Sequence, residues 1–229
     1  MYDKCVTLVA DPYPPYQYKD GGAVKGIDAD LIASAFQAVG YDVQVKLLPW
    51  EECLRQLDDE NADGIFQITR TPERERRYVF SELLRTAETA FFALSDQAIQ
   101  LSETVDLREQ LEPFTLGVLT EYSYDPAIDS LDPTTKVEVD GQEDLLLGLK
   151  DKCFDLAVMD SGVAAFLADK LGISGIKKVD GFAVTRELHV AFRPECEDLV
   201  AKFNTGLKKL KQQGTLQRIA ARYGLRRSI

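Results

Sequence analysis

Hydrophobic residues recur along the chain with two periods, one typical of strands and the other typical of helices. Short β-rich or alternating runs predict strands, while apolar residues three and four positions apart predict amphipathic helices. The predicted strands span residues 6–10, 43–47, 62–68, 89–94, 114–119, 136–139, 154–159 and 189–192. The predicted helices follow Gly26, cover 51–59, open at 71–74, lie near Leu107, follow Ser123, cover 143–149 and 163–171, and close the chain as two segments divided by Gly214. This alternation predicts an α/β protein with largely parallel sheets.

The pattern of strands and helices restarts in the middle of the chain. Each half predicts an α/β unit of roughly a hundred residues, which is an ordinary domain size. We expect the joins between the two units at residues 95–98 and 185–188. No apolar run approaches the ~18 residues that a helix needs to span a bilayer.

The charge balance argues against nucleic-acid partners. The 229 residues include 27 Lys and Arg against 38 Asp and Glu, a net charge of −11, and an acidic protein repels phosphate backbones. One basic cluster lies on the last helical pattern, at Arg218, Arg222, Arg226 and Arg227. A solvated helix face is the simpler explanation of this cluster.

Signatures of catalysis and of metal binding are largely missing from the sequence. There is no GxSxG, no GxxxxGK[ST] and no GxGxxG motif. The one histidine, His189, lies in an apolar strand and is expected to be structural. The cysteines Cys5, Cys53, Cys153 and Cys196 form no CxxC pair, so a zinc site of the usual spacing is excluded. Their even number permits disulfides in an oxidising compartment.

Aromatic residues cluster at predicted strand ends, next to turn prolines. Tyr13, Tyr16, Tyr18 and Trp50 lie where open α/β sheets bind ligands, outside the carboxyl ends of strands. Such rings could wall a small apolar or cationic group. Ordinary core or rim packing is an equally good explanation of any single tyrosine.

The segment 63–74 is the most informative part of the chain. Arg74 follows a predicted strand end and lies in the first turn of a helix, where its guanidinium can grip a carboxylate with two parallel hydrogen bonds. The hydroxyl and amide of Thr69, with the helix N-terminus, add donors to the same anion. The competing interpretation is a surface arginine in a charged helix start that also holds Arg70, Arg76 and Arg77.

A series of motifs covering nearly the whole chain resembles a known family. The matching stretches are Pro14-Pro15-Tyr16-Gln17-Tyr18, residues 26–31, Leu48-Pro49-Trp50, Ala62-Asp63-Gly64, residues 68–74, Phe80-Ser81, residues 154–160 and Gln213-Gly214-Thr215-Leu216. In this order and spacing they resemble the bacterial extracellular solute-binding proteins of family 3, the polar amino-acid binders of ABC uptake systems. Each motif alone is weak, and the ordered series carries the resemblance.

The resemblance implies a two-lobed, type II periplasmic-binding-protein-like α/β fold with two hinge crossovers and a ligand between the lobes. Lobe one would comprise residues 1–94 and 188–229, and lobe two residues 97–185, with hinges at about 95–98 and 185–188. By position, Arg74 would clamp the α-carboxylate of the ligand and Thr69 would add its amide and hydroxyl. Asp160 would take the α-ammonium. Tyr13 and Trp50 would flank the ligand side chain, and Ser123, at a helix start, would offer a backbone N–H.

The sequence also departs from the family pattern. Gln67 replaces a residue that is often small, and Arg70 replaces one that is often apolar. A Gly-rich loop of lobe two is replaced by Thr120-Glu121-Tyr122-Ser123-Tyr124. We therefore expect Gln67, Arg70, Glu121 and Tyr122 to crowd the pocket or change its polarity, with Gln67 and Tyr122 in its lining. The ligand need not be a standard α-amino acid.

The resemblance implies a non-enzymatic binding protein that needs no cofactor or metal and delivers an amino acid or related carboxylate to an ABC permease. Its setting would be periplasmic or extracellular, its state monomeric, and Cys5–Cys196 the preferred disulfide. The sequence starts without a signal peptide, so the chain is either cytoplasmic or has lost a targeting segment. One alternative is the sensor domain of a membrane receptor. Another is a dehydratase-type enzyme on the same fold, with Glu121 or Asp160 as the acid or base.

Overall fold

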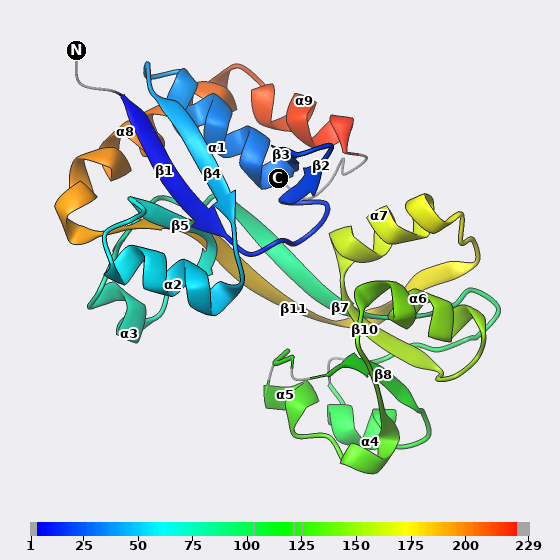
Figure 1. Cartoon of the computed structure of the whole chain (residues 1–229). Helices are drawn as coiled ribbons and strands as arrows, with labels where there is room; N and C mark the ends of the chain where they lie inside the picture. Colours follow the sequence, from blue (N-terminus) through cyan, green and yellow to red (C-terminus); the bar gives the residue numbers. More distant parts are fainter. Residues whose placement is uncertain (1–3, 103, 121, 125, 224–229) are drawn as a thin grey trace. The chain divides into compact units, whose positions relative to one another are not determined.

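The computed structural model describes residues 4–102, 104–120, 122–124 and 126–223, and the chain forms two compact units (Figure 1). Unit 1 holds the described residues up to Thr86 and from Arg186 onward, and unit 2 holds Ala87–Thr185. The strands β7 (Arg85–Leu94) and β11 (Ile176–Phe192) each continue from one unit into the other. The first division therefore lies inside β7, before the join expected at residues 95–98.

The core of unit 1 is a sheet with the strand order β4-β1-β5-β11. Its strands are β1 (Cys5–Ala10), β4 (Asp42–Leu47), β5 (Gly64–Thr69), the last part of β11, and the short β6 (Val79–Phe80) beside β11. β1 runs parallel to both neighbours, while β11 is antiparallel to β5. A separate hairpin pairs β2 (Tyr18–Asp20) with β3 (Ala23–Lys25).

Helices cover both faces of this sheet (Figure 1). One layer contains α1 (Ile27–Gln37), α8 (Glu197–Gln212) and α9 (Thr215–Arg222), and the other contains α2 (Trp50–Asp58) and α3 (Pro72–Glu75). A short 3-10 turn, Pro194–Cys196, leads into α8. On the second face, Cys53 and Leu57 of α2 pack with Val9 and Ile65 of the sheet. These apolar positions repeat every three or four residues in α2 and every second residue in the strands, which is why the sequence pattern predicted them.

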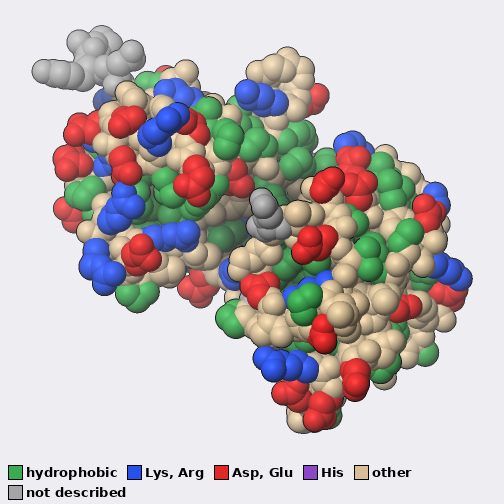
Figure 2. All heavy atoms as spheres, turned by 60° about the horizontal axis from the view of Figure 1, so that its bottom comes forward, with side chains coloured by type: hydrophobic (Ala, Val, Ile, Leu, Met, Phe, Trp, Pro, Cys, Tyr) green, Lys and Arg blue, Asp and Glu red, His purple; other side chains and the backbone are tan. Residues whose placement is uncertain are grey.

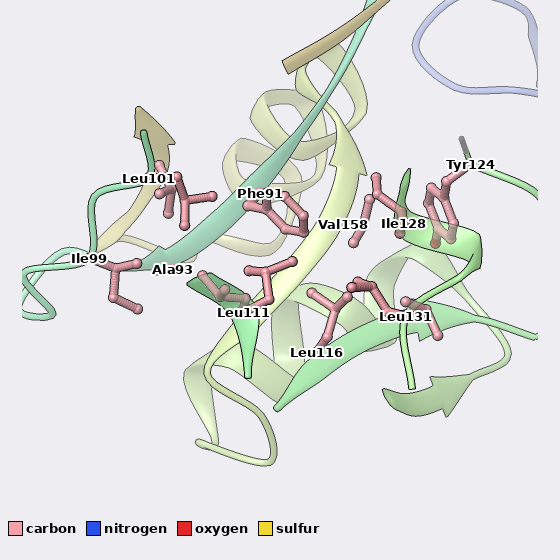
Figure 3. Packing of buried hydrophobic residues seen from close by; sticks show 13 residues of the cluster. Phe91, Ala93, Ile99, Leu101, Leu111, Leu116, Tyr124, Ile128, Leu131 and Val158 are labelled. Atoms are coloured by element: carbon pink, nitrogen blue, oxygen red, sulfur yellow. The ribbon is translucent and has the colours of Figure 1, made fainter. Parts of the chain in front are cut away.

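Unit 2 is built in the same way around the strand order β11-β7-β10-β8-β9. Its remaining elements are β8 (Leu116–Leu119), β9 (Lys136–Val139), β10 (Leu156–Asp160), α4 (Leu107–Leu111), α5 (Pro126–Asp129), a 3-10 turn at Pro133–Thr135, α6 (Gln142–Lys150) and α7 (Ser161–Leu171). β8 is parallel to β9 and β10, and β10 is antiparallel to β7. Figure 3 shows one core cluster of this unit, in which Phe91 and Val158 of the sheet face Leu111 and Ile128 of the short helices.

The predicted elements are confirmed with small shifts at their ends. The short strands β2, β3 and β6 were not predicted, and two larger features differ. β11 begins at Ile176, whereas the sequence predicted a strand only at 189–192. Apart from the buried Val179, the residues of its first part, 176–187, are half-exposed or exposed, and their apolar residues do not form a long buried run. Pairing with β7 defines this part as a strand. The sheets are also less parallel than expected, because β7 and β11 pair antiparallel with their neighbours β10 and β5.

All four cysteines lie in the described part of the chain and are free. The expected Cys5–Cys196 disulfide is therefore wrong. Cys5 is exposed at the start of β1, while the Cys196 sulfur lies 3.7 Å from Asp63 Oδ1 and 3.8 Å from Arg193 Nη2. The Cys196 sulfur thus contacts Asp63 and Arg193, and it forms no bond to Cys5.

The surface mixes both signs of charge. On the face shown in Figure 2, Asp and Glu side chains alternate with Lys and Arg over both units. In the part of the chain that the structure covers, no helix is both long enough and apolar enough to span a membrane.

Candidate functional site

The candidate residues of unit 1 gather at one edge of its sheet. β4, β1 and β5 run parallel, with Ala10 opposite Leu47 and Leu8 opposite Gly64. The carboxyl ends of these strands therefore meet at the same edge, which is where open α/β sheets bind ligands. Asp11 follows β1, Trp50 follows β4 by three residues, and Thr69 ends β5.

Arg74 is held at this edge by local sequence. Thr71 is the N-cap of α3, and its Oγ1 accepts a hydrogen bond from Arg74 N at 3.3 Å. Pro72 lies in the first turn, where a backbone N–H would have no partner within the helix, so its missing N–H costs nothing. The chain thus turns directly from β5 into α3. This turn brings the Arg74 side chain back over the end of β5.

The Arg74 guanidinium is fixed on two sides. Nη1 donates to the Thr69 carbonyl at 3.0 Å and to Thr69 Oγ1 at 2.6 Å. The guanidinium carbon lies 5.4 Å from the centroid of the Trp50 ring, within cation–π range. Among the described residues, Arg74 forms no ion pair, whereas Arg70 pairs with Glu75 and Arg77 with Asp58. A guanidinium has five N–H donors, so this arrangement leaves donors for an incoming anion.

The other arginines of this segment lie in different surroundings. Arg70 is exposed and stacks over the Phe80 ring at 6.0 Å in addition to its pair with Glu75. Arg76 and Arg77 are exposed as well, and Arg74 is the only half-buried member of the four. The sequence could not separate these arginines, because their spacing alone does not reveal which one turns back toward β5.

Gln67 is the extra residue of a β-bulge in β5. The pairing of β5 with β11 shifts register between His189 and Val190, and Gln67 takes a left-handed φ of 59°. A bulge re-aims the strand locally, and a left-handed backbone favours glycine. This geometry is a physical reason for the small residue that the family pattern suggested at this position.

Gln17 links the bulge to the loop that carries the candidate tyrosine. Its side chain is fully buried, and its Nε2 donates to Gln67 Oε1 and, at 3.0 Å, to the Asp11 carbonyl. In the same loop, Tyr13 N donates to the Gln17 carbonyl at 2.7 Å. Gln17 thus connects Gln67, through its side-chain amide, to Tyr13, through its backbone carbonyl. The sequence analysis did not single out this residue.

Asp11 is a second residue that the sequence analysis missed. It is half-buried at the end of β1, and burial raises the pKa of its carboxyl above the ordinary value, although a backbone hydrogen bond partly opposes this effect. It is also close enough to raise the pKa of the Cys53 thiol. An acidic residue directly after a buried strand and before a proline-rich loop was the available signal.

The candidate residues of unit 2 lie at the carboxyl ends of β8 and β10, which run parallel. Asp160 ends β10, is 4% exposed, and caps α7, since its Oδ1 accepts hydrogen bonds from Gly162 N at 2.9 Å and Val163 N at 3.0 Å. The carboxylate therefore has a structural role as the N-cap of α7. Its two oxygens together offer about four acceptor sites.

Tyr122 and Ser123 follow β8 and line a hollow of about 330 Å³ in unit 2. Ser123 precedes α5 by three residues instead of starting a helix, and its Oγ donates to Asp129 Oδ2 at 2.8 Å. The Tyr122 ring lies 4.7 Å from the Tyr124 ring. Glu121, the other residue expected here, lies outside the described residues.

The histidine and the acidic and cysteine side chains are the remaining candidates for a catalytic or metal-binding site. His189 is 6% exposed, its Nδ1 lies 3.0 Å from the Ser81 carbonyl, and its ring meets the Phe80 ring edge-on, so it is a structural core residue. Within the described ranges, no group of three or more His, Cys, Asp or Glu side chains could hold a metal ion.

Two α/β units linked by two strands that run from one unit into the other are the architecture of the type II periplasmic-binding fold. The model of the bacterial extracellular solute-binding proteins, family 3, matches residues 6–226, and the chain belongs to this family. The resemblance inferred from the motifs is confirmed.

Individual relatives agree with this assignment. The arginine-binding extracellular protein ArtP of Bacillus subtilis (strain 168) is 26% identical over 225 residues, 96% of this chain and 86% of that protein. The structure of the arginine-, lysine-, histidine-binding protein ArtJ from Geobacillus stearothermophilus matches with a TM-score of 0.71 at 19% identity, over 95% of this chain and 94% of that one. A histidine kinase sensor domain matches with a TM-score of 0.73 at 20% identity, over 96% and 95%. The expected type II periplasmic-binding fold is confirmed.

Proposed function

We propose that this protein captures a free amino acid and delivers it to an ABC permease at the outer side of the membrane. The observation that carries this proposal is the half-buried Arg74, held by Thr69 and Trp50 at the carboxyl edge of unit 1 and without an ion pair among the described residues. A guanidinium in this state suits an α-carboxylate, which it can bind through two parallel hydrogen bonds. The hydroxyl of Thr69 accepts from Arg74 and still has its own hydrogen to donate to the ligand.

The ammonium and the side chain of the ligand would be recognised by other candidate residues. Asp160 is the proposed partner of the α-ammonium, and Trp50 and Tyr13 are the proposed walls of the side-chain pocket. Tyr122, Ser123 and Gln67 complete the proposed lining. A buried ligand charge must be paired, so this zwitterion needs one cationic and one anionic residue, which Arg74 and Asp160 supply.

We further propose that the ligand carries a cationic side chain. Asp11 places a half-buried negative charge at the same edge of unit 1 as Arg74, and the net charge of −11 favours encounters with cations. The relatives ArtP and ArtJ are named for binding arginine, or arginine, lysine and histidine. L-Arginine is therefore the first ligand to test.

A sensor role is the second candidate, because one solved relative is a histidine kinase sensor domain. Capture of the ligand is common to both roles, and the neighbouring genes would separate them: a permease gene favours transport, and a kinase gene favours sensing. An enzymatic role is less well supported, since the named relatives are binding proteins.

The experiment is a binding screen on protein that has been unfolded, washed and refolded to remove any retained ligand. The panel contains the twenty amino acids and agmatine, the amine that arginine yields on losing its carboxylate. A ligand that binds only the folded state raises Tm by mass action. We expect L-arginine to raise Tm most, to bind once per chain by calorimetry, and to be recovered unchanged by mass spectrometry. No response to any amino acid at millimolar concentration, or conversion of the ligand, contradicts the proposal.

A further inference from the structure

A buried ion pair lies beneath the loop that carries Tyr13. Arg85 Nε lies 2.8 Å from Asp28 Oδ1 and 2.9 Å from Asp28 Oδ2, and the two side chains are 1% and 0% exposed. Both residues belong to unit 1, Arg85 at the start of β7 and Asp28 in the first turn of α1. The sequence analysis assigned neither residue a role at the site.

The same arginine stacks on Tyr16. The Arg85 guanidinium carbon lies 3.5 Å from the centroid of the Tyr16 ring, and this ring is only 3% exposed. A cation–π contact gains strength when both partners are removed from water. Arg85 therefore fixes the position of Tyr16 on one face of its ring.

Tyr16 in turn stacks against Tyr13. The two ring centroids are 6.0 Å apart and the ring planes differ by 12°. The backbone of this loop also docks on α1, since Asp28 N donates to the Tyr16 carbonyl at 2.9 Å and Ile27 N to the Pro15 carbonyl at 3.1 Å. A continuous series of contacts thus runs from the ion pair through Tyr16 to Tyr13, the proposed wall of the side-chain pocket.

Stability alone is a weak reason for a buried ion pair. The desolvation of two charges offsets much of their attraction, and replacing such a pair by well-packed hydrophobic side chains of similar volume is often neutral or stabilising. A planar guanidinium, by contrast, can satisfy a carboxylate and stack on an aromatic ring at the same time. This combination is what the geometry requires of position 85.

We propose that Arg85 and Asp28 are positioning residues of the ligand site, which hold Tyr16 and thereby set the place of Tyr13 against the ligand side chain. The inference rests on the proposed function, because it assumes that Tyr13 contacts the ligand. It predicts a selective effect. Loss of the pair weakens recognition of the side chain and leaves recognition of the carboxylate by Arg74 intact.

The test uses the double variant Asp28→Asn/Arg85→Met, which removes both charges at nearly unchanged volume. The single variant Arg85→Met leaves an unpaired buried charge and is expected to lose more stability than the double variant. The matched control is Asp58→Asn/Arg77→Met, which removes the exposed ion pair on the same unit. Calorimetry then measures the affinity of each protein for L-arginine, glycine and agmatine.

In the double variant we expect the preference for L-arginine over glycine to fall about five- to tenfold, since Tyr13 must then be ordered during binding. The preference for L-arginine over agmatine should stay within about twofold of wild type. Amide hydrogen exchange of residues 13–18, measured without ligand, should become faster in the double variant and not in the control.

Two results overturn the inference. One is a double variant that folds and keeps both the arginine-to-glycine preference and the slow exchange of residues 13–18. The other is an equal loss of both preferences, which indicates general damage to the site. Failure of the wild type itself to bind any of the three probes contradicts the proposed function instead, and the exchange measurement still decides whether the pair orders the loop.

Discussion

At the scale of single residues, the candidate site depends on hydrogen bonds made within a short segment. Thr69 and Thr71 both contact Arg74, one at its guanidinium and one at its backbone amide. The side chain is thereby ordered before a ligand arrives, so less conformational entropy is lost on binding.

Thr69→Val tests this arrangement, because valine matches the shape of threonine and lacks the hydroxyl. We expect the affinity for L-arginine to fall about tenfold, equivalent to roughly 1.5 kcal/mol for a hydrogen bond to a charged group. Calorimetric titration gives the value. Thr69→Ser keeps the hydroxyl and should remain within about threefold of wild type, and equal affinities of the Val and Ser variants would refute a role for Oγ1.

The bulge at Gln67 can be tested by comparing the stabilities of the glycine and alanine variants at this position. In an ordinary strand glycine is less stable than alanine by roughly 0.5–1 kcal/mol. At the left-handed φ of Gln67 the order should be inverted, with Gln67→Gly more stable than Gln67→Ala by about 1 kcal/mol. Both variants lack the hydrogen bond from Gln17, so urea unfolding of the pair isolates the backbone effect. An alanine variant as stable as the glycine variant would show that the bulge is absent.

At the scale of elements, α1 and α8 pack so closely that one position must be glycine. A Cβ on Gly206 of α8 would lie 2.0 Å from the carbonyl oxygen of Ala35 in α1. The buried face of α8 also carries Phe203 and Leu207, so the helix has little freedom to move away.

Gly206→Ala should therefore destabilise the protein by about 1–3 kcal/mol through overpacking, although alanine is the better helix former by about 1 kcal/mol. Denaturant unfolding measures this difference. Thr205→Ala, on the exposed side of the same helix, is the control and should stay within about 0.5 kcal/mol of wild type. An increase in stability of the Gly206 variant would contradict the close helix contact.

The elements also show what the sequence could and could not predict. Periodic apolar residues predicted α1, α2, α6, α7 and α8 well, because burial against a sheet imposes their spacing. The first part of β11 was not predicted, because its strand conformation depends on pairing with β7 and not on its own hydrophobic pattern.

The candidate site could be predicted only in part for a related reason. Arg74 and Thr69 are close in sequence, so their spacing after a strand indicated their proximity. The contacts of Gln17 with Gln67 and of Arg85 with Asp28 join residues 50 and 57 positions apart. The tertiary fold brings such residues together, and no local sequence pattern predicts their contact.

At the scale of the whole molecule, buried groups that resist ionisation make stability depend on pH in the alkaline range. Burial is the main cause that raises the pKa of Cys53 to about 11, from an ordinary value of 9.0, and that of Tyr223 to about 12. The folded state thus favours the neutral Cys53 thiol. As the pH rises, this thiol loses its proton at a lower pH in the unfolded chain than in the folded protein.

The stabilisation from Cys53 is therefore complete below about pH 9 and is lost as the pH rises toward 11, by an amount on the order of 2 kcal/mol. Urea unfolding at several pH values should show this loss in the wild type. Cys53→Ala should show a smaller loss over the same range, whatever its stability at pH 7. Parallel curves for the two proteins would show that the thiol is not buried in a neutral state.

The central claim is that Arg74 binds the carboxylate of the ligand, and a thermodynamic cycle tests it most directly. Wild type and Arg74→Met are each titrated with L-arginine and with agmatine, which lacks only the carboxylate, and Arg76→Met serves as the exposed control. We predict that wild type prefers L-arginine by at least about thirtyfold, in line with about 2–5 kcal/mol for a buried charge pair, and that Arg74→Met binds both compounds with similar affinity. An unchanged preference in Arg74→Met would contradict the account.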